Sequence, residues 1–122
     1  MSGPTLEGGT AQMVTTDRLT TRVLFTGPED GVPVLFLHGN ASSATWWEEN
    51  MLALPPRYRG IALDQRGCGD ADMDKKVDAT RGAGDWADDS VALLDHLGID
   101  KAQIAGCSLG GYVIWYMLRE FP

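Results

Sequence analysis

Short apolar runs along the chain predict the strands of a buried sheet. Residues 33–37 have the sequence Pro-Val-Leu-Phe-Leu, and an apolar run without polar alternation is typical of a strand that is covered on both faces. Residues 58–63 favour another buried strand, and residues 102–107 favour a short strand. We therefore predict three strands at these positions, the first two of them buried.

The N-terminal region predicts a hairpin. Residues 12–16 and 19–26 favour strands, joined by a turn at Asp17 and Arg18. The segment before them, residues 1–11, is rich in Gly, Ser and Thr and is expected to be disordered.

Three stretches are predicted to be helical: residues 46–54, 85–97 and 109–120. Thr45 and Glu48 have the spacing of a capping box, in which each side chain bonds a free backbone N–H at the helix start. Asp85 is expected to cap the second helix, and Gly98 to end it in the left-handed conformation. Because strands and helices alternate from residue 33 onward, we predict an α/β fold with a mainly parallel, doubly wound sheet.

The composition argues against two classes of partner, nucleic acid and anionic membranes. The 17 acidic and 10 basic residues give a formal charge of -7, which disfavours binding to nucleic acid and to anionic membranes. The apolar runs are too short to cross a bilayer, and the first residues lack the features of a signal peptide, so we expect a cytoplasmic protein. Cys68 and Cys107 are expected to be reduced thiols, Cys107 buried, and neither a metal nor a cofactor is expected.

The strongest chemical signal is a glycine-flanked serine between a predicted strand and a predicted helix. In residues 106–110, which we call the elbow, Gly106 and Gly110 flank Ser108 where a sharp turn leaves no room for side chains. Such a turn exposes the Ser108 hydroxyl as a candidate nucleophile and makes the Leu109 N–H a candidate oxyanion donor. The alternative is a glycine turn whose serine only caps the helix. The nucleophile hypothesis predicts a positive φ at Ser108 and no tolerance for Gly110→Val.

Two further motifs accompany the elbow. His38, Gly39 and Asn40 follow one predicted buried strand, and residues 64–69 (Asp-Gln-Arg-Gly-Cys-Gly) follow the next. With these motifs and the elbow in this order, the chain resembles the N-terminal part of a domain of the α/β-hydrolase superfamily over residues 12–122. The resemblance implies a serine hydrolase of the carboxylesterase type.

The resemblance also implies roles for the motif residues. Asn40 would supply the second oxyanion N–H, and the alternative is an ordinary turn residue. His38 and Gly39 would be structural, and Asp64 would orient residues 65–69 through backbone hydrogen bonds.

Two tryptophans and a second histidine are weaker candidates. Trp46 and Trp47 follow the Asn40 loop, where one is expected to line an apolar substrate pocket and the other to pack under the helix. Core packing of both is the alternative. His96 falls in the last turn of its predicted helix, where a cation favours the helix dipole, so we expect a structural role.

In the family a catalytic acid and then a histidine follow the serine along the chain. Residues 109–122 contain one acid, Glu120, and no histidine. We therefore expect both groups from a C-terminal portion of the same hydrolase, foremost as a separate chain, with a truncated sequence or a short inactive protein as alternatives. The helix at 109–120 is apolar all round and should be buried in the complete protein, although a sheet with only the N-terminal strands cannot cover it. Residues 1–122 alone are therefore expected to be inactive and not a stable monomer.

The predicted reaction is hydrolysis of a carboxylic ester, a lactone or a related acyl compound through an acyl-enzyme on Ser108. Within the family, haloalkane dehalogenases and epoxide hydrolases carry an aspartate at this position, so the serine argues against both. Carbon–carbon bond hydrolases and cofactor-free haloperoxidases keep the serine and stay open as alternatives. A receptor that binds a small molecule without turnover is the alternative from another class.

Overall fold

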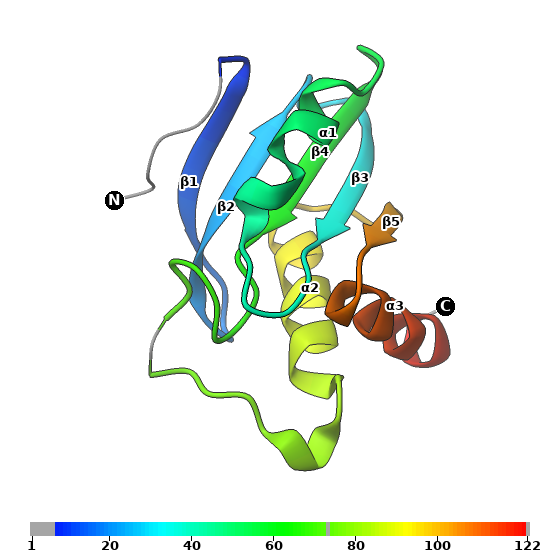
Figure 1. Cartoon of the computed structure of the whole chain (residues 1–122). Helices are drawn as coiled ribbons and strands as arrows, with labels where there is room; N and C mark the ends of the chain where they lie inside the picture. The colour runs from blue at the N-terminus through cyan, green and yellow to red at the C-terminus, as the bar shows by residue number, and fades with distance from the viewer. Residues whose placement is uncertain (1–6, 73, 122) are drawn as a thin grey trace.

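Five strands form one mixed sheet in the order β1-β2-β4-β3-β5 (Figure 1). The computed structural model describes residues 7–72 and 74–121. The strands are β1 (Gly9–Thr15), β2 (Thr20–Thr26), β3 (Val32–Leu37), β4 (Tyr58–Leu63) and β5 (Gln103–Gly106). β2 pairs with β1 and β4 in antiparallel orientation, whereas β3 runs parallel to β4 and β5. The carboxyl ends of β3, β4 and β5 therefore meet at one edge of the sheet.

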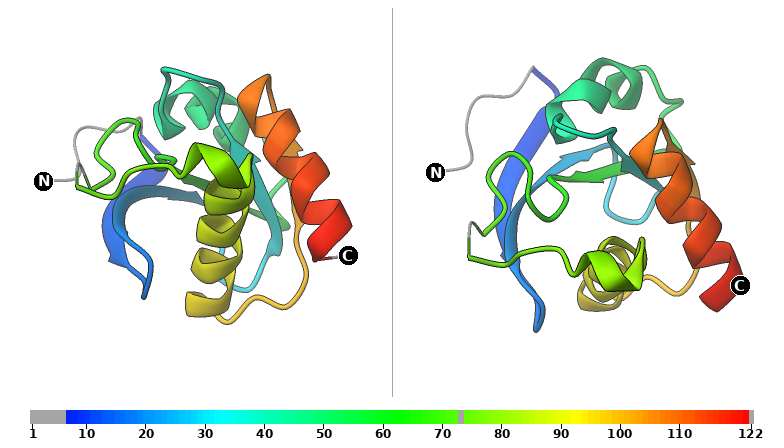
Figure 2. Two further views of the ribbon diagram at one scale, coloured as in Figure 1. Left: turned by 90° about the horizontal axis from the view of Figure 1, so that it is seen from below. Right: turned by 60° about the horizontal axis from the view of Figure 1, so that its bottom comes forward.

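Helices cover both faces of the sheet (Figure 2). On one face lie a 3₁₀ helix (Ala44–Trp47) and α1 (Glu48–Leu52), and on the other lie α2 (Gly84–His96) and α3 (Leu109–Glu120). A short 3₁₀ turn (Ala79–Arg81) precedes α2. Among the helices of the described residues, none is long and apolar enough to span a bilayer.

Successive side chains of the inner strands point to opposite faces of the sheet, so the core has two layers. The layer toward α2 and α3 receives Val23, Leu35, Leu37, Ile61 and Leu63. The layer toward α1 receives Leu24, Val34, Phe36 and Ala62. Burial on both faces explains why the sequence of β3 is apolar without alternation.

The predicted α/β class and the two buried strands, β3 and β4, are confirmed, whereas β5 is only partly buried. β4 and α3 have the predicted bounds, and the hairpin of β1 and β2 turns at Asp17 and Arg18 as expected. β1 begins at Gly9, because β2 supplies a pairing partner for each residue back to that point. Residues 9–11 are therefore strand, which corrects the disorder expected for residues 1–11, whereas residues 1–6 lie outside the described residues.

The predicted capping box is wrong. Thr45 lies inside the 3₁₀ helix, and its Oγ1 accepts a hydrogen bond from Arg22 Nη1 at 3.0 Å. No side chain caps this helix or α1, and α1 ends at Leu52, earlier than predicted. The hydrogen-bond partner of Thr45 is Arg22 in β2, which is distant in sequence. The local Thr-x-x-Glu pattern therefore could not predict the role of Thr45.

Asp85 is not the cap of α2 either. The helix begins at Gly84 after Ala83, and Asp85 lies in its first turn. The Asp85 carboxylate accepts a hydrogen bond from the Asp78 N–H at 2.7 Å, and so fastens the loop before the helix. Gly98 ends α2 with φ 72°, as predicted.

The described residues bury only part of α3, in agreement with the expectation that these strands cannot cover the helix. The helix buries one stripe, formed by Gly110, Val113 and Met117. Trp115 is 76% exposed and Leu118 is 63% exposed on the other side. The reason is that β5 is the last strand of this sheet, so the described residues offer α3 only one surface to pack against.

Candidate active site

Ser108 stands at the turn between β5 and α3. Its backbone has φ 56° and ψ −113°, and the residue is exposed. The positive φ predicted for this serine is confirmed. Among the described residues, Ala41 (φ 55°) is the other non-glycine residue with positive φ, and it lies in the loop that follows β3. The two strained residues thus flank one edge of the sheet, and such strain is characteristic of functional sites.

The glycines of the elbow have the steric role that the sequence predicts. A Cβ on Gly110 would overlap the carbonyl oxygen of Leu37 in β3 and lie 2.8 Å from its carbonyl carbon. A Cβ on Gly106 would lie 2.6 Å from the carbonyl carbon of Gly110. Both distances are shorter than non-bonded atoms allow, so the close approach of α3 to the strands requires glycine at both positions.

The loop after β3 lies against the elbow. A Cβ built on Gly39 would be 3.5 Å from the Ser108 Cβ and 3.4 Å from the Cys107 carbonyl oxygen. Asn40 follows Gly39 and is exposed. Neither the Asn40 N–H nor the Leu109 N–H donates a hydrogen bond to the backbone within the part of the chain that the structure describes. Both N–H groups are thus without a backbone acceptor among the described residues, as an oxyanion donor must be.

His38 is fully buried and has both ring nitrogens in hydrogen bonds. Its Nε2 accepts the Gln65 N–H at 2.9 Å, and its Nδ1 lies 2.7 Å from the Gly39 carbonyl oxygen. Because a backbone N–H can only donate and a carbonyl can only accept, Nδ1 must carry the proton of a neutral ring. His38 therefore has no free nitrogen to accept a proton from Ser108.

We expect His38 to make the folding stability decrease as the pH falls. Burial lowers the pKa of His38 from its ordinary 6.5, against the opposing effects of the Gly39 carbonyl and the Asp64 carboxylate. As the pH falls below 6.5, His38 binds a proton in the unfolded chain but stays neutral in the folded chain. Stability present above this pH should therefore fall by up to about 1.4 kcal/mol per pH unit.

Urea denaturation between about pH 7.5 and pH 5 checks this expectation. In the His38→Asn variant the amide does not titrate, so the slope of stability against pH should be smaller than in the unmodified protein. Equal slopes in both proteins would contradict the assignment.

Asp64 joins the two loops that follow β3 and β4. One carboxylate oxygen accepts the Ala44 N–H at 2.8 Å, and the other accepts the Asp70 N–H at 2.9 Å. Gly69, with φ 51°, leaves room for this carboxylate, since a Cβ there would overlap Asp64 Oδ2. The loop-orienting contacts expected of Asp64 are present, and they reach the Asn40 loop as well.

Sequence reasoning missed a buried charge cluster behind these loops. Asp89 on α2 is 1% exposed and accepts two hydrogen bonds from Arg66, at 2.7 and 2.8 Å, and one from Arg18 at 2.7 Å. The hydrogen bonds to Asp89 are the main reason that the pKa of Arg66 is raised. The cluster fixes the loop after β4 to α2, although the residues are far apart in sequence and share no local motif.

The two candidate tryptophans differ in their surroundings. Trp46 is 56% exposed, and its ring stands nearly perpendicular to that of Trp47 at a centroid distance of 4.8 Å. Trp47 packs on Phe36 of β3 at 5.0 Å. Its buried Nε1 has no hydrogen-bond partner among the described residues. Trp47 is thus partly buried against the core of the α1 face, whereas Trp46 is exposed and can contact another molecule.

The prediction that Cys107 is buried is wrong. Cys107 is exposed and Cys68 is intermediate, and both are free thiols. Cys107 directly follows β5, the edge strand, so no further strand of the described residues covers its side chain.

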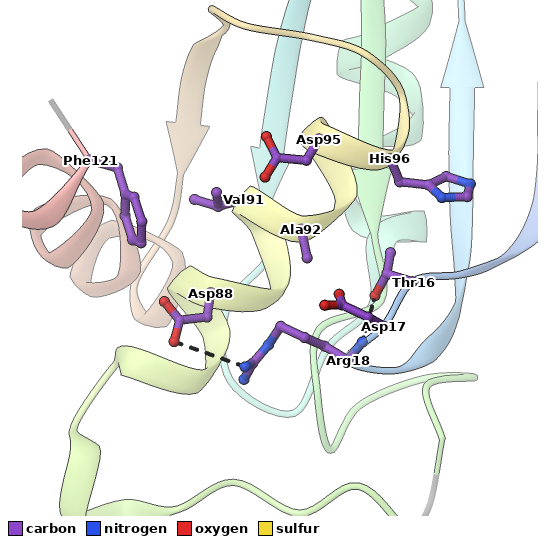
Figure 3. A pocket seen from close by; sticks show the side chains of 9 residues that line it. All are labelled: Thr16, Asp17, Arg18, Asp88, Val91, Ala92, Asp95, His96 and Phe121. Atoms are coloured by element: carbon purple, nitrogen blue, oxygen red, sulfur yellow. Dashed lines mark hydrogen bonds and ion pairs between the residues drawn. The ribbon is translucent and has the colours of Figure 1, made fainter.

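A pocket of about 490 Å³ lies elsewhere, between the hairpin turn and α2 (Figure 3). Arg18 and Asp88, which are paired across it, and His96 line this pocket, and Ser108 does not. His96 occupies the last turn of α2, as predicted, and the chain from there leads to the start of β5. Because Ser108 follows the carboxyl end of β5, His96 and Ser108 lie at opposite ends of the parallel strands.

Comparisons with known proteins agree with this geometry. The family model described as the alpha/beta hydrolase fold matches residues 32–122. The chain is 36% identical to an uncharacterized carboxylesterase of Bacillus subtilis over 84% of this chain and 33% of that protein. It is 31% identical to a second carboxylesterase of Bacillus subtilis, over 81% of this chain and 33% of that protein.

Solved structures include an epoxide hydrolase from Vigna radiata with a TM-score of 0.83 and 29% identity, which matches 98% of this chain and 37% of its own. The chain thus spans about a third of the length of the relatives that it matches. Since the family model covers most of the sequence, the chain belongs to the α/β-hydrolase fold family.

Proposed function

We propose that the protein carrying this chain is a serine hydrolase that acts on carboxylic esters, lactones or related acyl compounds. The observation that carries the proposal is the strained, exposed Ser108 at the N-terminus of α3, with the Asn40 loop packed against it. The Ser108 hydroxyl gives its proton to the catalytic histidine and attacks the substrate carbonyl; the alcohol leaves with that proton, and water hydrolyses the acyl-enzyme to release the carboxylic acid. The Asn40 and Leu109 N–H groups stabilise the negative charge that develops on the carbonyl oxygen.

The catalytic acid and base come from residues outside this sequence. His38 has both ring nitrogens in hydrogen bonds, and His96 lies at the opposite end of the parallel strands from Ser108. These are the two histidines of the sequence. We propose that a C-terminal portion of the same hydrolase, in the same chain or in a separate one, supplies the histidine and the carboxylate beside β5 and α3.

The names of the relatives support an ester substrate, with one competitor. Two of the relatives are named carboxylesterases, and others are named epoxide hydrolases. A serine forms an acyl-enzyme with an ester, whereas opening an epoxide in this fold uses an aspartate at the elbow. The identity of Ser108 therefore favours the ester.

A fluorophosphonate probe tests the proposal, because it bonds covalently to an activated serine. We expect the protein that carries this chain to be labelled within minutes, and mass spectrometry to place the adduct on Ser108. The Ser108→Ala variant should lose both the labelling and the turnover of p-nitrophenyl esters. Slow labelling that survives this substitution, or ester turnover that survives it, would overturn the assignment.

A further inference from the structure

The two residues that follow β4 fasten both ends of the loop after β3. At the front end, the Gln65 N–H donates to His38 Nε2 at 2.9 Å, and Gln65 Nε2 donates to the His38 carbonyl oxygen at 2.8 Å. At the rear end, Asp64 Oδ1 accepts the Ala44 N–H at 2.8 Å. Between these ends Ala41 is kept at φ 55°. A loop held at both ends in a strained shape has one orientation for the groups that it carries.

The Gln65 N–H also decides which nitrogen of His38 bears the proton. It occupies Nε2 as a donor, so the proton must be on Nδ1, where the Gly39 carbonyl oxygen accepts it at 2.7 Å. The exposed fraction of His38 is 0%, so water does not compete for either nitrogen. Through the His38 ring, the Gln65 N–H in the loop after β4 thus fixes the hydrogen bond to the Gly39 carbonyl in the loop after β3.

That carbonyl shares a peptide unit with the Asn40 N–H. In a trans peptide the C=O and the N–H lie in one plane and point in opposite directions, and the structure has no cis peptide bond among its described residues. When the Gly39 C=O points at the buried His38 ring, the Asn40 N–H must point away from it, toward the exposed side of the loop. The hydrogen bond at Nδ1 therefore fixes the direction of the proposed oxyanion donor.

We propose that His38, kept in its Nδ1–H tautomer by the Gln65 N–H, is a positioning residue that orients the Asn40 N–H toward the oxyanion. The inference rests on the proposed function, since it assigns a role in the same reaction. His38 touches neither substrate nor Ser108, and acts through the Gly39–Asn40 peptide. An oxyanion donor is effective only when it already points at the place where the charge develops, so loss of this orientation lowers kcat rather than substrate affinity.

Two variants separate the two hydrogen bonds of the ring. An Asn side chain places its amide N–H near the position of Nδ1, and His38→Asn keeps the bond to the Gly39 carbonyl. A Gln side chain places its amide oxygen near the position of Nε2, and His38→Gln keeps the bond from the Gln65 N–H. We expect kcat for a p-nitrophenyl ester to fall about 10²-fold in His38→Gln with KM unchanged, and to stay within about tenfold of the unmodified protein in His38→Asn.

A boronic acid inhibitor gives a matching readout, because its adduct with serine carries a tetrahedral oxyanion. Its inhibition constant should weaken in His38→Gln in proportion to kcat, and recover in His38→Asn. Unchanged kcat in a folded His38→Gln, or a change confined to KM, would overturn the inference while leaving the serine hydrolase intact. An unmodified protein without ester turnover would instead overturn the proposed function, and the inference with it.

A measurement on the unmodified protein covers the case in which a variant fails to fold. ¹⁵N NMR of labelled histidine distinguishes the protonated ring nitrogen from the unprotonated one. We expect the proton on Nδ1 of His38 at neutral pH. A neutral ring protonated at Nε2 would exclude the bond to the Gly39 carbonyl, and a ring protonated at both nitrogens would exclude the bond from the Gln65 N–H. Either result would overturn the inference.

Discussion

The Gly110→Ala variant should lose at least about 3 kcal/mol of folding stability. The added methyl group would overlap the Leu37 carbonyl oxygen and lie 3.1 Å from the Leu37 Cβ. Both atoms belong to the buried strand β3, which is hydrogen-bonded on each side and cannot move away. The larger side chain in Gly110→Val should prevent folding. Chemical denaturation of the protein that carries this chain measures the loss.

The next residue provides the control. Gly111 also lies in the first turn of α3, but a Cβ there would meet no atom within 4 Å. Gly111→Ala should therefore be neutral or stabilise by up to about 1 kcal/mol, because alanine favours a helix over glycine. Equal effects of the two substitutions would show that helix propensity, and not the contact with β3, sets the requirement at Gly110.

Much of the fold was predictable from local pattern. The bounds of β4 and α3 follow from apolar runs that end in turn-forming residues, and such runs need no knowledge of their partners. The extent of burial was less predictable, because it depends on what lies beside an element. α3 has apolar residues all round, yet Trp115 is exposed, because β5 is the edge of the sheet.

In the candidate site, too, the local features were predictable and the contacts between distant segments were not. The elbow was predictable, because the positive φ of Ser108 and the approach to Leu37 impose glycine at fixed spacing within one segment. The contact between Gln65 and His38 joins residues that are 27 positions apart. It exists because β4 lies next to β3, so that the two loops leave the sheet side by side. A single sequence carries no signal for that neighbourhood until the strand order is known.

The second large effect is expected at Asp89, where Asp89→Asn should cost about 3–5 kcal/mol. The carboxylate is 1% exposed and binds the guanidinium of Arg66 through both oxygens, while Arg18 Nε donates to one of them at 2.7 Å. Arg66 is itself only 7% exposed. The amide of asparagine would remove the negative charge and turn an N–H group toward these donors. Arg66 would then remain buried without its hydrogen-bonded counter-charge and with only the weaker attraction of Asp85, which is costlier than losing an exposed pair.

The adjacent residue on the same helix tests this reasoning with the same chemical change. Asp88 pairs with Arg18 at 4.0 Å and with Arg81, but its side chain is 25% exposed. Asp88→Asn should therefore cost about 1 kcal/mol or less, since water screens the pair and can replace it. Urea denaturation of both variants at neutral pH compares the two losses.

Because Arg66 belongs to the loop that also carries Asp64 and Gln65, Asp89→Asn should lower ester turnover as well. A loss at Asp88 as large as that at Asp89 would show that net charge, and not the buried pair, determines the stability of this region.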